Sequence, residues 1–254
     1  MVVDIKELNT YMQCPLMWKL KYKDNLIPQK RFMVHEVFNQ AIHQLFYYLF
    51  NQVQNNYYPS GYHVKQAWGR IWCPGRSMQQ ILSHLYSNGN KITYNPRFKE
   101  RQGLDIGLRL REQYKEKPGV PILVGQTYTV PLGRHTVSGL IELVRIVDEE
   151  VELIDVRMSK RRAEQTQLKH DVELTAASFA LRYLLKTKES YVQYLYLDTG
   201  AIYKSTRGTE DYKRLVKILD NFEKAIKHEL IVPNLGGQCH TCSYRLHCLR
   251  KQWF

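Results

Sequence analysis

The hydrophobic periodicity of the chain changes near its middle, and this change limits the possible folds more than any other feature. Before position 120 the apolar residues recur at helical spacing, as in MVHEVFNQAIHQLFYYLFNQV at residues 33–53. From Pro121 they alternate with polar residues in three segments, residues 121–132, 135–147 and 150–159. Helical spacing then returns at residues 164–187 and 209–230, with one strand at 191–198 between them. This order predicts an α/β fold in which a β-meander follows a helical lobe.

The first helical segment is interrupted by a proline. Pro15 follows Cys14 directly, and a proline ring cannot continue a helix through its own position. We therefore expect a helix, a tight break and a second helix before residue 23. With 254 residues and 44% hydrophobic content the chain can bury one sizeable core or two small ones, and we expect one main domain with appendages. We divide the chain into N-terminal helices, a helical lobe, an α/β core and a cysteine-bearing tail. The four segments are residues 1–23, 24–118, 119–230 and 231–254.

The charge of the chain favours a polyanionic partner. Its formal net charge is +13 and its isoelectric point is near 9.4, and such an excess of Lys and Arg favours association with phosphates because condensed counterions are released. Nucleic acid is the leading candidate, and the alternative is a merely basic protein. The sequence has no run of about 18 apolar residues and begins without a basic flank or an apolar stretch, so we expect a cytoplasmic protein without a membrane partner.

Three of the five cysteines lie close together near residue 240. Cys239, Cys242 and Cys248 occupy the segment QCHTCSYRLHC, in which a C-x2-C pair places two thiolates in one tight loop. Disulfides are unlikely in the expected compartment, so the cluster predicts metal ligation. Spacing alone leaves open an iron–sulfur cluster, a zinc site of four cysteines, and a zinc site in which His240 or His247 is a ligand. The isolated Cys73 is interpreted as a small core residue.

Two acidic residues lie on neighbouring predicted strands. Glu142 and Asp155 are separated by a short turn, and Arg157, two residues beyond Asp155, shares its face of the strand. Two carboxylates beside a cation provide the hard oxygen ligands that magnesium or manganese needs to activate water against a phosphodiester. The alternative is a solvated face or a surface salt bridge, because acidic residues are common at strand ends.

The cysteine pattern also carries a resemblance to a known family. The helix ending YMQCPLMWKLKY, together with the cysteine trio, resembles the RecB/AddB-like iron–sulfur exonucleases, a group that includes the CRISPR-adaptation nucleases. The resemblance implies a PD-(D/E)XK core like that of restriction endonucleases. It also implies that Cys14 is the fourth ligand of a 4Fe-4S cluster completed by Cys239, Cys242 and Cys248.

The same resemblance assigns roles to residues of the middle of the chain. In FNQAIHQLF, His43 takes the place of a metal-binding histidine, with His35 as a rival on the same helix; in SGLIEL, Glu142 stands where aspartate is usual. In LIDVRMSK, Asp155 is the acid and Arg157 replaces the expected lysine. The resemblance thus implies that His43, Glu142 and Asp155 bind magnesium or manganese. A later motif also departs from the family, because its glutamine and tyrosine are replaced by Glu173 and Ala177.

Together these features predict a metal-dependent DNA nuclease that cuts or trims DNA, single-stranded or at an end. The alternative is a catalytically disabled DNA-binding subunit that acts with a partner protein, because a guanidinium at position 157 stays charged and cannot transfer protons as a lysine can. Trp68, Trp72 and Tyr86 either stack on unpaired bases or belong to the core. We expect DNA phosphates to be contacted by Lys160, Arg161 and Arg162.

Overall fold

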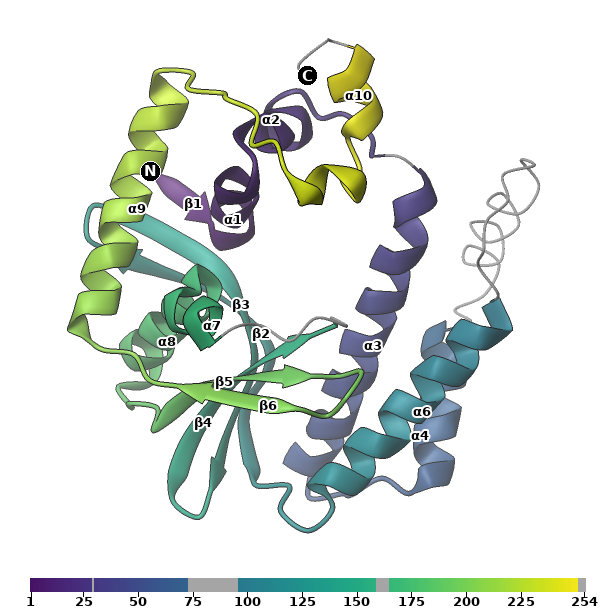
Figure 1. The fold of residues 1–254 in the computed structure, drawn as a ribbon. Helices are drawn as coiled ribbons and strands as arrows, with labels where there is room; N and C mark the ends of the chain where they lie inside the picture. The colour runs from purple at the N-terminus through teal and green to yellow at the C-terminus, as the bar shows by residue number, and fades with distance from the viewer. Residues whose placement is uncertain (29, 73–95, 159–164, 251–254) are drawn as a thin grey trace.

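The computed structural model describes residues 1–28, 30–72, 96–158 and 165–250 of the chain, and its elements are drawn in Figure 1. Several residues named above lie outside these ranges, namely Cys73, Tyr86, Lys160, Arg161 and Arg162. Among the described ranges, no helix combines the length and the apolar character needed to cross a bilayer.

A six-stranded mixed sheet forms the centre of the molecule. Its strand order is β1-β3-β4-β5-β6, and β2 also pairs with β3. The pairs β1–β3 and β4–β5 are parallel, whereas the other neighbours are antiparallel. The strand bounds are β1 Val2–Asp4, β2 Val120–Leu132, β3 His135–Val147, β4 Glu150–Arg157, β5 Tyr191–Tyr196 and β6 Ile202–Ser205. The predicted meander is therefore confirmed as β2, β3 and β4.

The strand β3 changes partner along one of its edges. Residues 136–138 of β3 pair with β1, and residues 143–147 of the same strand pair with β4. Residues 139–142 lie between these two pairings. The change of partner therefore opens the sheet beside Glu142, which lies one step before the first residue paired with β4.

Helices cover both faces of the sheet (Figure 1). The bounds of the N-terminal helices are α1 Ile5–Gln13, α2 Pro15–Trp18 and the π-helix η1 Lys19–Lys23. The helices of the predicted lobe are α3 Lys30–Gln54, α4 Gly61–Trp72 and α6 Pro96–Tyr114. Those after the meander are α7 Gln165–His170, α8 Val172–Leu185, α9 Thr209–Lys227, the 3-10 helix η2 Gly237–His240 and α10 Arg245–Arg250. The predicted break after Cys14 is confirmed, because α1 ends at Gln13 and α2 begins at Pro15.

Two hydrophobic cores meet at the sheet. One core joins α1, α8 and α9 to one face, and includes Leu153 of β4 and Val192 of β5. The other joins α3, α4 and α6 to the opposite face, and includes Ile154 of β4 and Leu195 of β5. Successive strand residues thus belong to different cores, as the alternation of a strand requires. The division of the chain into four segments stays a prediction.

Trp68 and Trp72 belong to the second core. Each is 2% exposed, and their rings stack with centroids 5.4 Å apart and an interplanar angle of 12°. Gly103 of α6 permits this packing, since a Cβ there would lie 2.0 Å from the Trp68 ring. The base-stacking interpretation of these two tryptophans is therefore wrong, because their rings contact protein and have almost no exposed surface.

The region after the meander differs from the prediction. Residues 164–187 were expected to form one helix, but α7 ends at His170 and α8 begins at Val172. Asp171 lies between them with extended backbone angles, and its Oδ1 accepts a hydrogen bond of 2.7 Å from the backbone N–H of Leu174. Asp171 is thus an N-cap that starts a second helix. The short strands β1 and β6 were also absent from the prediction.

Candidate active site and cysteine cluster

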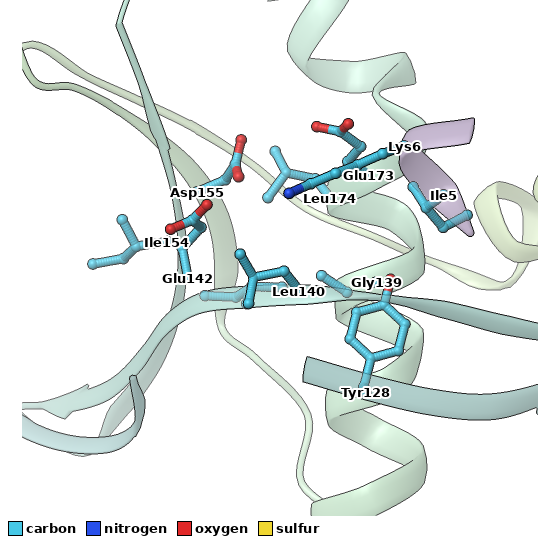
Figure 2. A pocket seen from close by; sticks show the side chains of 12 residues that line it. Ile5, Lys6, Tyr128, Gly139, Leu140, Glu142, Ile154, Asp155, Glu173 and Leu174 are labelled. Carbon is cyan, nitrogen blue, oxygen red and sulfur yellow. The ribbon is translucent and has the colours of Figure 1, made fainter. Parts of the chain in front are cut away.

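A pocket of about 40 Å³ lies where β3 changes partner (Figure 2). Its walls come from α1, β2, β3, β4 and α8. The polar side chains in its lining include Glu142 of β3, Asp155 of β4, Glu173 of α8 and Lys6 of α1. Figure 2 shows the carboxyl groups of Glu142 and Asp155 pointing toward one another. The structure therefore brings the two predicted acids into one pocket.

Glu142 is held from the opposite face of the sheet. Its side chain is almost buried, and its Oε2 lies 3.2 Å from Nδ1 of His43. The hydroxyl of Tyr47 donates a short hydrogen bond to the same oxygen. Both contacts use Oε2, and among the described residues Oε1 has no hydrogen-bond partner. Burial and the neighbouring Glu142 carboxylate raise the pKa of Tyr47, so its hydroxyl stays a donor.

Asp155 lies across from Glu142 if the β3–β4 register is continued by one step beyond the pair Leu143–Ile154. Burial raises the pKa of Asp155 to about 8, against the opposing effect of Arg157 and with the help of the nearby acids Asp171, Glu142 and Glu173. Its Oδ2 lies 2.5 Å from Nε of Arg157, yet neither atom has an aligned hydrogen-bond partner. Asp155 thus carries a buried oxygen whose bonding capacity is not satisfied within the described residues.

Arg157 is bound by three acids. Besides Asp155, its Nη2 lies 2.9 Å from Oε2 of Glu173 and 3.4 Å from Oδ2 of Asp171. The guanidinium also lies over the Tyr194 ring, 4.9 Å from its centroid. The three carboxylates raise the pKa of Arg157 despite its burial. Arg157 is therefore a fixed cation whose planar donor groups are directed at residues of the protein itself.

A close approach of two strands shapes the floor of the pocket. Tyr128 of β2 lies over Gly139 of β3, and a Cβ at position 139 would be 2.5 Å from the tyrosine hydroxyl oxygen. Both residues line the pocket. Gly139 is required because no side chain fits beneath this ring.

The predicted site residues are gathered in part. His43, Glu142, Asp155 and Arg157 lie around one pocket, whereas His35 belongs to the segment whose side chains the structure does not describe. Within the described part of the chain, the ligand atoms of His43, Glu142 and Asp155 do not all lie within 4.8 Å of one another. His43 contacts Glu142, and Arg157 contacts Asp155. These contacts must break before His43, Glu142 and Asp155 can bind one ion together.

Sequence reasoning missed several residues that shape the site. Tyr47 lies one helical turn after His43, and the i,i+4 spacing was a signal that both side chains point the same way. Asp171 and Glu173 flank the start of α8, where acidic residues are typical of a helix N-terminus. Lys6 carried no such signal, because β1 brings it to the pocket through pairing with β3.

The donor set fits a divalent cation. Glu142, Asp155 and Glu173 line the pocket, Asp171 lies next to it, and Arg157 neutralises only part of their charge. The carboxylate oxygens of Asp155 and Glu142 are hard oxygen donors, which magnesium and manganese prefer, and Oε1 of Glu142 has no hydrogen-bond partner among the described residues.

A different group of ligand atoms lies within 4.8 Å, formed by His135, Asp220 and Glu223. Arg134 already neutralises these acids, since its Nε lies 2.8 Å from Asp220 and its Nη2 lies 2.8 Å from Glu223. Nε2 of the buried His135 lies 2.9 Å from Asp220. The group is therefore an ion-pair network that ties the β2–β3 turn to α9.

The four predicted cluster cysteines line a second pocket of about 30 Å³. Cys14 lies between α1 and α2, and the other three belong to the segment that contains η2 and α10, which Figure 1 shows beside α2. Leu16 and Leu20 pack against Tyr244 and Cys248, so a small apolar core joins the two segments.

The thiols are shielded and contact few other groups. Burial, followed by the neighbouring cysteines, raises the pKa of Cys248 to about 11 and also raises the pKa of Cys242. The backbone N–H of Asn234 donates to Sγ of Cys14 at 3.5 Å, and that of Tyr244 donates to Sγ of Cys242 at 3.4 Å. Neither His240 nor His247 is among the residues that line this pocket.

Comparison with known proteins decides the family. The family model described as PD-(D/E)XK nuclease superfamily matches residues 5–249 of the chain. The chain belongs to this superfamily. Its members are generally nucleases and use divalent metal ions, in agreement with the acidic pocket. The chain is also similar to the protein in "Crystal structure of SSO0001", with a TM-score of 0.42, 12% sequence identity, and coverage of 98% of this chain and 86% of that one. No curated protein matches the chain.

Proposed function

We propose that the protein is a metal-dependent deoxyribonuclease of the RecB/AddB-like iron–sulfur group that trims single-stranded DNA or DNA ends. The observation that carries the proposal is the pair Glu142 and Asp155, whose carboxyl groups face one another in one pocket beside Glu173. The membership in a nuclease superfamily supports the reaction class. The preference for single strands or ends follows from the resemblance of the cysteine pattern to that group.

Glu142 and Asp155 are the residues that would hold the divalent ion, with His43 as a third ligand. When bound, such an ion supplies a Lewis acid and lowers the pKa of a coordinated water. Tyr47 and His43 orient Glu142 from behind through its Oε2, so that its other oxygen stays directed toward the pocket. Oδ2 of Asp155 lies 2.5 Å from Nε of Arg157 without an aligned hydrogen bond, so this ion pair would have to loosen for the oxygen to bind the ion.

Arg157 acts as a fixed counter-charge in this mechanism. Its contacts with Asp155, Asp171 and Glu173 reduce the repulsion of these three carboxylates for one another and for the phosphate of a substrate. A guanidinium in this position does not take up or release protons at neutral pH. Proton transfer must therefore come from solvent or from another titratable group of the site, while Arg157 holds the charge balance.

The electrostatic attraction for DNA comes from the whole chain. The net charge of +13 favours phosphate binding of low sequence specificity, and Lys160, Arg161 and Arg162 remain the proposed contacts close to β4. Arg157 marks the end of β4, so these basic residues follow the catalytic strand directly in sequence.

The cysteine pocket is proposed to hold a 4Fe-4S cluster. A single zinc ion binds thiolates at about 2.3 Å, which sets tetrahedral sulfurs about 3.8 Å apart. Among the four cysteines, all of which the structure describes, no three sulfur atoms lie within 4.8 Å of one another, although all four residues line one pocket. A cluster separates its thiolates by irons and sulfides and suits this wider spacing. The lack of a lining histidine speaks against a three-cysteine zinc site.

The nuclease proposal is tested by Asp155→Ala with manganese and a labelled single-stranded oligonucleotide. The substitution removes the oxygen ligand of the proposed site, so cleavage should fall by about 10³-fold or more. DNA affinity measured with calcium should change by less than about threefold, because phosphate contacts and chemistry are separate contributions.

Asp105→Ala is the matched control, since Asp105 is an exposed acid on α6, away from the pocket lining. It should cut at the wild-type rate. If the wild type binds DNA but does not cut it with magnesium or manganese, the protein is the alternative, a DNA-binding subunit with a disabled nuclease pocket. The extensive pairing of Arg157 is the observation that favours this second candidate.

A further inference from the structure

Lys6 is a cation in the acidic pocket that the proposed mechanism does not use. It lies in the first turn of α1 and lines the pocket together with Glu142, Asp155 and Glu173. Its backbone N–H donates to Oδ1 of Asp4 at 2.7 Å, whereas its amino group has no hydrogen-bond or ion-pair partner among the described residues. Lys6 is thus an unpaired ammonium group beside several carboxylates.

The fold fixes the backbone position of this lysine, whose side chain is exposed. Asp4, the last residue of β1, pairs with Ser138 of β3, so α1 begins directly above the opening in the sheet. Ile5 is 2% exposed and belongs to the core beneath α1, which anchors the backbone next to Lys6. Figure 2 shows the amino nitrogen of Lys6 extending into the pocket, between Glu173 and Glu142. Its position is therefore set by backbone pairing and core packing.

The other cation of the site, Arg157, is already paired with acids of the protein, so Lys6 is the group that can neutralise a bound phosphate. The guanidinium of Arg157 is directed at Asp155, Asp171 and Glu173 and is 4.9 Å from the Tyr194 ring centroid. Within the described residues that line the pocket, Lys6 is the one cationic side chain. A phosphodiester brings negative charge into a site that already holds three carboxylates. An ammonium group with free donors can compensate for that charge where a bound guanidinium cannot.

We propose that Lys6 is a substrate-binding residue of the nuclease pocket, whose ammonium group donates a hydrogen bond to a non-bridging oxygen of the phosphodiester to be cut. This inference rests on the proposed nuclease function and adds a residue from α1 to the acids of β3 and β4. The contact orients the phosphate and offsets the charge that develops on its oxygens during in-line attack. It also makes the N-terminal segment part of the active site.

Lys6→Ala tests the inference in the protein purified with its cofactor. Lys213→Ala is the matched control, because Lys213 is an exposed lysine of α9 that pairs with Glu210, so both variants lose one positive charge. At saturating DNA with manganese, Lys6→Ala should lower kcat by about 10²-fold, the usual effect of removing one donor from a developing anion. Lys213→Ala should leave kcat unchanged, and Lys6→Arg should recover part of the lost rate. Equal rates for Lys6→Ala and the control would overturn the inference.

A second measurement does not depend on cleavage. Reductive methylation of the wild-type protein, followed by mass spectrometry, reports the accessibility of each lysine amine with and without a phosphorothioate single strand in calcium. Lys6 should be protected by DNA while Lys213 should not. Protection in a protein that cuts no DNA would refute the nuclease proposal and retain the phosphate contact. Unchanged methylation of Lys6 on saturating DNA would refute the inference even if the protein is a nuclease.

Discussion

The acidic pocket and the cysteine pocket are built in different ways. In the acidic pocket the chain supplies its own counter-charges, because Arg157 binds three acids and His43 and Tyr47 hold Glu142. In the cysteine pocket the thiols have weak backbone donors and face one another. The first pocket can keep its shape without an ion. If the proposed cluster is bound, the second gains its main cohesion from the metal centre that replaces the thiol protons.

This comparison predicts that substitutions in the two sites affect different properties, namely activity in one and stability in the other. Loss of one of the proposed metal-binding acids, Glu142 or Asp155, should reduce activity with little effect on folding. Loss of a cysteine should reduce the stability of the whole chain, because Cys14 connects the N-terminal helices to the segment of Cys239 and Cys248. The catalytic role of one site and the structural role of the other should thus be distinguished by measuring the melting temperature and the cleavage rate of the same variants.

The largest effect is expected for Cys14→Ala. We expect loss of the cofactor and of about 5 kcal/mol of unfolding free energy, which is roughly 10–20 °C in melting temperature for a chain of this size. The anaerobically purified wild type should be brown and contain iron, and the variant should be colourless. Cys73→Ala, at the cysteine outside the proposed ligand set, is the control and should keep the colour and the iron content. Colourless wild-type protein with stoichiometric zinc would contradict the cluster.

A smaller effect is expected for Arg157→Lys. The ammonium group cannot reach three acids at once, so the unfolding free energy should fall by about 1–3 kcal/mol. If the fixed guanidinium limits the reaction, cleavage should rise by about tenfold, because a lysine is free to contact the substrate. Arg182→Lys is the control, since Arg182 binds Glu189 in a similar ion pair outside the pocket. It should lose stability without any change in rate.

The smallest effect, when it is compared over one pH unit, concerns pH. Without divalent ions, the folded state holds the Asp155 proton up to about pH 8, whereas the unfolded chain releases it near the ordinary value of 3.8. The folded state therefore binds more protons between these values, and the unfolding free energy should fall as pH rises through this window, by at most about 1.4 kcal/mol per pH unit. Asp155→Asn should remove this part of the pH dependence in denaturant titrations with EDTA. An identical slope in both proteins would show that Asp155 is already ionised at neutral pH.

Local sequence patterns predicted much of the sheet. Strict alternation located β2 and β3 within one residue of their ends, because each face of these strands packs on a different layer. The same patterns missed the short β1, which has only three residues. The break at Asp171 was also missed, although an aspartate three residues before a buried leucine is a known signal for a helix start.

The residues of the candidate site that lie close together in the sequence were predicted, and most of those that come from distant segments were missed. Glu142 and Asp155 were found because one hairpin carries both. Tyr47 reaches Glu142 through packing of α3 and Lys6 reaches the pocket through pairing of β1. The spacing of Tyr47 from His43 shows that the two side chains share a helix face, but no local pattern shows what this face contacts. The ion pairs of Arg157 with Asp171 and Glu173 depend on the position of α8, which starts 15 residues after Arg157 in the sequence. Contacts of this kind follow from tertiary structure.

The hydrogen bonds from α3 to Glu142 have a consequence for communication within the molecule. His43 and Tyr47 reach Glu142 from the helical layer, while the other oxygen of this carboxyl faces the pocket. Under the proposed function, an ion that displaces Glu142 would weaken the hydrogen bonds between this residue and α3. By thermodynamic reciprocity, a molecule whose binding shifts α3 would change the affinity of the pocket for the ion by the same factor by which the ion changes the affinity for that molecule. A partner or a DNA strand bound to the helical layer would then alter cleavage through α3 without contacting the pocket.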